Sequence, residues 1–176
     1  MNEIIKKNGI NYGIITGVIS ILITTIIYVT NIELFTSMWI GLASIAIYII
    51  IGLVLLTKTK KELNNIYPFK DAFTTYFISA VIGILISVAF NIVLFNFVDP
   101  GVKDTIKELS IKSAVSMMQK FGAPSSAIND AVKEMQNTDQ FSISKLLQGS
   151  VFSILFSAIF GLILAAIFKS KPSYQQ

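Results

Sequence analysis

Four long windows of the sequence carry no charged residue, and their length is what most constrains the fold. They lie between Lys7 and Glu33, Glu33 and Lys58, Asp71 and Asp99, and Lys145 and Lys169. A helix needs about 20 apolar residues to cross the hydrocarbon core of a bilayer. Each window is long enough and is rich in Ile, Leu, Val and Phe, without the apolar–polar alternation of a membrane β-barrel. The sequence therefore predicts an all-α membrane protein, a four-helix transmembrane bundle with spans at about 10–29, 35–56, 73–97 and 147–168.

The composition excludes several kinds of catalytic and metal-binding site. Hydrophobic residues make up 53% of the 176 residues and charged residues 14%, and there is neither cysteine nor histidine. Disulfide frameworks, thiolate or imidazole metal sites, and nucleophiles that depend on Cys or His are thereby excluded. We expect no cofactor, no metal and no catalytic residue, so the chain is predicted not to be an enzyme.

The distribution of lysine predicts the orientation in the membrane. Lysines crowd the N-terminal tail, the connection at 57–72 and the C-terminal tail, whereas the first connection has only Glu33. Positively charged loops stay on the cytoplasmic side. We therefore expect a multi-pass protein of the inner membrane, a single domain over 1–176 with both termini and the 57–72 loop in the cytoplasm. The first span is predicted to be a retained anchor. The net charge of +4 then reflects topology, and no nucleic-acid partner is expected.

The connection at 99–146 is much longer than neighbouring helices need. It opens with Asp99-Pro100-Gly101, and apolar residues then recur at helical spacing over 102–121, before Gly122-Ala123-Pro124 and a second helix from about Ser125. We expect an extracytoplasmic helical hairpin between spans 3 and 4 that lies on the membrane surface or caps the bundle. Its apolar face would comprise Val102, Ile106, Leu109, Ser113, Met117 and Phe121.

Small residues recur every four positions in three of the spans. Because lipid gives helices no hydrophobic reason to associate, such stripes favour close helix packing. The candidate packing residues are Gly9, Gly13 and Gly17 in the first span, Ser79, Gly83 and Ser87 in the third, and Ser153, Ser157, Gly161 and Ala165 in the fourth. Packing within one chain is favoured, and a dimer interface or a docking face for a partner is the alternative. Asn91 and Asn96 are the intramembrane polar candidates, either as interhelical hydrogen-bonding groups or as functional ones.

The order of these features resembles a known family. The start Tyr12-Gly13-Ile14-Ile15-Thr16-Gly17, the Ala72-Phe73 entry to the third span, its Asp99-Pro100 end and the long helical insert are similar to uncharacterised small four-span inner-membrane proteins of Gram-negative bacteria, a domain of unknown function. The resemblance covers nearly the whole chain and implies fold and location but no catalytic residues. Members are often encoded near a membrane glycosyltransferase of the sugar-nucleotide type, which implies an accessory role in lipid-linked sugar chemistry.

Three functions remain open from the sequence. The favoured one is a non-enzymatic scaffold or accessory subunit in the lipid bilayer, whose partner is another membrane protein or a second copy of itself. The alternative is a homo-oligomeric channel or small transporter for a neutral or lipid-like solute, with Asn91, Asn96, Thr74, Thr75 and Tyr48 facing a shared lumen. An enzyme acting on a lipid headgroup would have to use Asp99, Asp104 and Glu108, which lack the spacing of a calcium loop.

Overall fold

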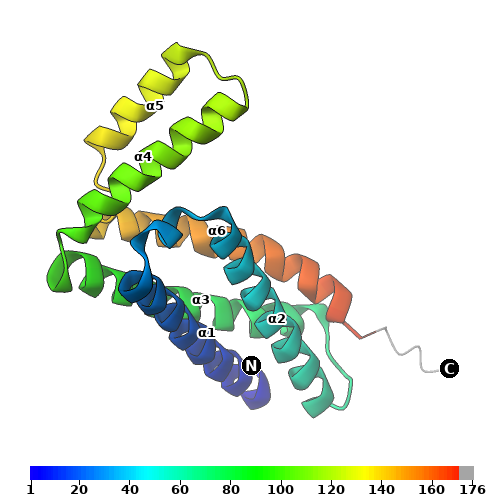
Figure 1. Cartoon of the computed structure of the whole chain (residues 1–176). Helices are drawn as coiled ribbons and strands as arrows, with labels where there is room; N and C mark the ends of the chain where they lie inside the picture. The colour runs from blue at the N-terminus through cyan, green and yellow to red at the C-terminus, as the bar shows by residue number, and fades with distance from the viewer. Residues whose placement is uncertain (171–176) are drawn as a thin grey trace.

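The computed structural model describes residues 1–170, and these residues form helices and no strand (Figure 1). Four helices are long and apolar enough to cross a membrane, and they coincide with the four predicted spans. The long helices are α1 (Glu3–Thr30), α2 (Met38–Glu62), α3 (Phe69–Val93) and α6 (Ile143–Phe168). Two shorter helices, α4 (Val102–Lys120) and α5 (Ser125–Asn137), lie between α3 and α6. A 3₁₀ turn, η1 (Ile32–Thr36), precedes α2, and a π-helical turn, η2 (Leu94–Val98), extends α3.

The helix boundaries differ from the expected spans at several ends. The second span was expected from residue 35, but Phe35 lies in η1, where the Asn31 side chain accepts a hydrogen bond from the Glu33 amide, and α2 begins only at Met38. Elsewhere the helices run past the apolar windows, so the connection expected at 57–72 shrinks to 63–68. A charged residue ends an apolar window but does not end a helix, because the backbone hydrogen bonds continue through it.

The most extensive helix contact joins α1 to α3, which are not neighbours in the sequence. The two helices run parallel: Gly9 faces Ile78, Gly13 faces Ile82 and Gly17 faces Ile86. A Cβ placed on Gly13 would lie 2.7 Å from the Cβ of Ile82 and 2.9 Å from the carbonyl oxygen of Ser79. The backbones are therefore too close to accept any side chain at this glycine.

The end of the bundle that holds the N-terminus and the 63–68 connection, here called the terminal end, is closed by a small core. Its buried members are Leu56, Tyr67, Ala72, Leu164 and Ala165. Two hydrogen bonds fasten the end of α6 to the connection: the Ser170 amide donates to the Tyr67 carbonyl at 2.8 Å, and the Tyr67 amide donates to Ser170 Oγ at 2.9 Å. Lys171 lies outside the described residues.

The hairpin of α4 and α5 extends away from the four long helices, so the expectation that it caps the bundle is wrong (Figure 1). Gly122, at φ +72°, ends α4 in the left-handed conformation that favours glycine, and α5 folds back against α4. Val102 and Ile106 are buried at the base, whereas Phe121 at the tip is 84% exposed. Only the residues at the base of this face, Val102 and Ile106, are buried against the bundle, in a cluster that includes Tyr28 and Phe90.

Candidate functional site at the hairpin end of the bundle

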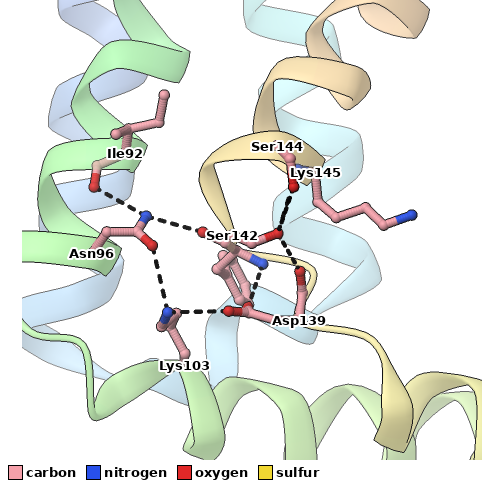
Figure 2. A network of polar contacts seen from close by, with 8 residues as sticks. Ile92, Asn96, Lys103, Asp139, Ser142, Ser144 and Lys145 are labelled. Atoms are coloured by element: carbon pink, nitrogen blue, oxygen red, sulfur yellow. Dashed lines mark hydrogen bonds and ion pairs between the residues drawn. The ribbon is translucent and has the colours of Figure 1, made fainter.

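A network of polar contacts fixes the base of the hairpin (Figure 2). The Asn96 side-chain amide, in the π turn, donates to the Ile92 carbonyl at 3.2 Å and to the Phe141 carbonyl at 3.0 Å. The Lys103 ammonium, in the first turn of α4, lies 3.5 Å from Asn96 Oδ1 and 3.2 Å from Asp139 Oδ2. The network joins the end of α3, the start of α4 and the segment before α6. Asn96 is thus a connecting residue at the base, and its amide is used within the chain.

Aromatic side chains pack beneath this network. The Phe95 ring lies 4.6 Å from the Phe141 ring and 5.9 Å from the Phe35 ring, centroid to centroid. The three come from η2, from the segment before α6 and from η1. Buried Leu94, Val102 and Ile106 complete the cluster. The base of the hairpin is therefore a packed joint, although the tip is free of the bundle.

Asp99 takes a structural position at the same joint. Its Oδ2 accepts the Tyr28 hydroxyl at 2.9 Å, and its Oδ1 accepts the backbone amide of Val102 at 3.2 Å, as a side chain capping a helix does. Asp104 and Glu108 lie on the exposed surface of α4. The structure does not bring these three carboxylates together, and residues 1–170 include no group of three or more His, Cys, Asp or Glu side chains that could hold a metal ion.

Beside the joint, a pocket of about 340 Å³ lies between α1, α2 and α3. Its wall mixes apolar side chains with hydroxyl groups from all three helices and with the Asn91 amide. The polar lining comprises Ser20, Thr24, Ser37, Ser44, Tyr48, Ser87 and Asn91, and the apolar lining includes Ile23, Ile27, Leu34, Phe35, Ile40, Phe95 and Phe141. Within the described part of the chain, no charged side chain lines this pocket.

Two observations describe the hydrogen bonding of the polar groups in the pocket wall. The Ser20 and Ser87 hydroxyls lie 2.7 Å apart and bond each other across α1 and α3. Asn91 Oδ1 is buried, and no partner for it is found among residues 1–170. A buried carbonyl oxygen without a hydrogen bond is costly, especially within an apolar wall. Because this oxygen has less than 1 Å² of exposed surface, it lies within the wall and is not open to the pocket.

The candidate packing residues fall into two groups. The buried Gly9, Gly13, Gly17, Ser79 and Gly83 lie between α1 and α3, where Ser87 bonds Ser20, and Gly161 and Ala165 are buried at the terminal half of α6. Ser153 is exposed, and its hydroxyl bonds the Gly149 carbonyl of its own helix, so the expected packing role is wrong for it in the single chain. Ser157 is half-buried. The small-residue stripe of α6 meets the bundle only near its end.

Sequence reasoning missed an interhelical hydrogen-bonding residue next to the first stripe. Asn8 is buried, and its amide donates to Thr59 Oγ1 at 3.1 Å and to Glu62 Oε2 at 2.6 Å, which joins α1 to α2. Its position one residue before Gly9 could have been read as the edge of a contact face.

Tyr76 was also missed as a packing residue. A Cβ on Gly52 would lie 3.0 Å from its ring, and a Cβ on Gly161 would lie 2.8 Å from it. Tyr76 of α3 thus fills a space left by two glycines, one on α2 and one on α6. The isolated Gly52 gives no stripe in the sequence, so this contact had no pattern to reveal it.

A family model described as "Protein of unknown function (DUF4199)" matches residues 11–170. The chain belongs to this family. The resemblance to an uncharacterised family is thereby confirmed. The DUF4199 match runs through α4 and α5, so the hairpin is part of the family's domain. No curated protein and no solved structure matches the chain.

Proposed function

We propose that this DUF4199 protein is a non-enzymatic accessory subunit of a membrane complex, and that the α4–α5 hairpin is the element that docks on its protein partner. The observation that carries the proposal is the hairpin itself, which extends away from the four long helices (Figure 1). Phe121 is 84% exposed and Met117 43% exposed, whereas the base residues Val102 and Ile106 are buried. Large exposed apolar side chains at the end of a rigid support are typical of interaction surfaces.

The joint at the base supports a docking role because it holds the hairpin in one direction. Asn96, Lys103 and Asp139 form one connected network, and the Phe35, Phe95 and Phe141 rings pack below it. A surface held in place loses less conformational freedom when a partner binds than a flexible loop does. A hairpin on such a joint is suited to present its tip to a second protein.

We further propose that the protein lies in the bacterial inner membrane with both termini in the cytoplasm and the hairpin outside it. Lysines gather at the terminal end of the bundle, at Lys6, Lys7, Lys58, Lys60, Lys61, Lys70 and Lys169, next to the spans. Charges of this kind near the ends of spans remain in the cytoplasm. The process that the family resemblance implies is cell-envelope chemistry on lipid-linked sugars.

The absence of cysteine makes the orientation easy to test. Ser125→Cys at the hairpin and Asn65→Cys in the 63–68 connection each provide a single thiol. In intact spheroplasts a membrane-impermeant maleimide should label the first variant, and it should label the second only after lysis. Labelling in the reverse order would overturn the proposed orientation.

Site-directed photo-cross-linking in native membranes tests the docking role. A benzoylphenylalanine at Phe121 should give one discrete adduct with a membrane protein that also co-purifies with the tagged chain in stoichiometric amount. The matched control is the same probe at Phe156, which is 70% exposed on α6, and it should give no such adduct. Recovery of the protein alone as a defined oligomer, with no adduct at Phe121, would overturn the accessory role and favour the channel alternative.

A further inference from the structure

The pocket between α1, α2 and α3 has the features of a ligand site, and the residues that line it indicate the kind of ligand that fits. It lies within membrane-spanning helices and reaches from Ser37, before α2, down to Tyr48. At 1.5 Å per residue this is a depth of about 15 Å along α2. A ligand that fills it must therefore enter the bilayer on the hairpin side of the protein.

The polar groups of the wall determine the kind of headgroup that fits. Asn91 Oδ1 has less than 1 Å² of exposed surface, so it lies within the wall and takes no part in binding. Hydroxyl groups of Thr24, Ser37 and Tyr48 line the pocket and can accept as well as donate. Since no charged side chain lines the pocket within residues 1–170, an ionised headgroup would be buried there without a counter-charge.

The apolar part of the wall indicates where the rest of the ligand lies. Ile23, Ile27 and Ile40 line the pocket on α1 and α2, whose outer surfaces face lipid. A Cβ on Gly41 would meet no atom within 4 Å, so α2 leaves open space at the pocket. An acyl chain can remain in the bilayer beside these residues while its headgroup enters between the helices.

We propose that this pocket binds the uncharged, hydroxyl-bearing headgroup of a lipid, whose hydroxyls bond the hydroxyl groups of Thr24, Ser37 and Tyr48. The proposal does not depend on the docking role of the hairpin, because the pocket lies between α1, α2 and α3 and the exposed tip takes no part in it.

Three lipids with the same acyl chain test the headgroup. The full-length protein, purified in lauryldimethylamine oxide, which has no hydroxyl group, is incubated with monooleoylglycerol, methyl oleate or oleoyl-lysophosphatidylglycerol, and retained lipid is measured by native mass spectrometry. One neutral hydrogen bond changes affinity by roughly 2- to 10-fold. We expect monooleoylglycerol to be retained about fivefold or more over both others. Equal retention of methyl oleate, or preference for the anionic lipid, would overturn the proposal.

Two glycines provide a matched pair of variants. Gly41→Leu fills the pocket, and Gly149→Leu places the same side chain on α6, outside the pocket lining; a Cβ at either position meets no atom within 4 Å. Both variants should fold, as checked by helical circular dichroism. Gly41→Leu should lose most of the bound monooleoylglycerol and Gly149→Leu none. Unchanged retention in Gly41→Leu would show that the lipid binds elsewhere.

Tyr48→Phe removes one of the lining hydroxyls and keeps the aromatic ring. It should lower the retention of monooleoylglycerol about fivefold and leave that of methyl oleate unchanged, as expected for one lost hydrogen bond. An equal loss for both lipids would indicate a change in the shape of the pocket, and it would contradict a hydrogen bond to the lipid headgroup. Free glycerol added in excess should not compete; competition by glycerol would identify the site as one for a water-soluble polyol.

Discussion

The two ends of α2 differ in how tightly they pack against the other helices. At the terminal end Leu55, Leu56 and Thr59 are completely buried, and Gly52 lies against Tyr76. At the hairpin end Met38 and Trp39 are exposed, a Cβ on Gly41 would meet no atom within 4 Å, and the helix borders a pocket. The same helix is thus tightly packed over one half and loosely packed over the other. In a membrane the difference arises from small and polar contact residues, because apolar surface alone does not select a neighbour.

The largest expected effect comes from adding a side chain where the helices are closest. Gly13→Leu would force α1 and α3 apart, since its Cβ meets both Ile82 and the Ser79 carbonyl oxygen below 3 Å. We expect a loss of about 3 kcal/mol in the free energy of unfolding, at the upper end of what overpacking costs. Thermal unfolding in detergent measures it, with Gly149→Leu as the control that should remain near wild type. Equal stability of the two variants would show that the α1–α3 contact is not tight.

A smaller loss is expected when the polar link between α1 and α2 at the terminal end is removed. Asn8→Ala abolishes the bonds to Thr59 and to the Glu62 carboxylate, and should cost about 2 kcal/mol because hydrogen bonds to charged groups are among the stronger ones. The control is Asn11→Ala on the exposed face of the same helix, which should have little effect. If the two alanine variants unfold alike, Asn8 does not contribute to closing this end.

At the hairpin end, Asn96→Leu should loosen the joint more than it destabilises the bundle. The loss of its bonds to Ile92 and Phe141 should cost about 1 kcal/mol. It should also accelerate amide hydrogen exchange in segment 139–142. Lys103→Met removes the partly exposed ion pair with Asp139 and should cost only about 0.5 kcal/mol. If exchange became faster in the terminal half of α2 and stayed unchanged in 139–142, the role of Asn96 in the joint would be contradicted.

The smallest effect at neutral pH is expected for Tyr67→Phe. The Tyr67 hydroxyl is buried at the terminal end and lacks a hydrogen-bond partner among residues 1–170, so its removal should leave stability unchanged or slightly raised. Burial, the main cause, raises the pKa of Tyr67 from 10.0 to about 12, and the neighbouring Asp71 carboxylate acts in the same direction.

The sign of the pH dependence of Tyr67 follows from that shift. The phenol of the unfolded chain ionises at its ordinary pKa, so folded stability is retained below pH 10.0 and lost as the pH rises towards about 12. Ultraviolet phenolate absorbance should show one tyrosine titrating late in the wild type, and this late component should vanish in Tyr67→Phe. A titration curve identical in both proteins would contradict the burial of this phenol.

The features that could be predicted from the sequence each depend on a single segment of the chain. The charge-free windows identify α1, α2, α3 and α6 because crossing a membrane depends on composition over one segment. The hairpin helices were predicted nearly to the residue, since Gly122 and Pro124 interrupt the chain chemically. The Gly13 stripe indicated a close approach, yet nothing in it names α3 as the neighbour.

The parts that could not be predicted depend on pairs of segments. Asn91 and Asn96 are alike in sequence context, but one lies in the wall of a pocket and the other bonds a carbonyl at Phe141, far along the chain. The direction of the hairpin likewise depends on packing between η1, η2 and the segment before α6. Such contacts depend on how segments that are distant in the sequence are placed relative to one another. A single sequence has no periodic pattern that indicates this placement.

The Tyr76 contact has a consequence for how the family can vary. One ring occupies the space left by missing side chains on two other helices, at Gly52 and Gly161. The identities at these three positions are therefore interdependent, although they lie on three separate helices. A family member with alanine or serine at either glycine position should carry a smaller residue at the tyrosine position. Substitution at one site should be tolerated only after change at another, so the three positions should covary across DUF4199 sequences.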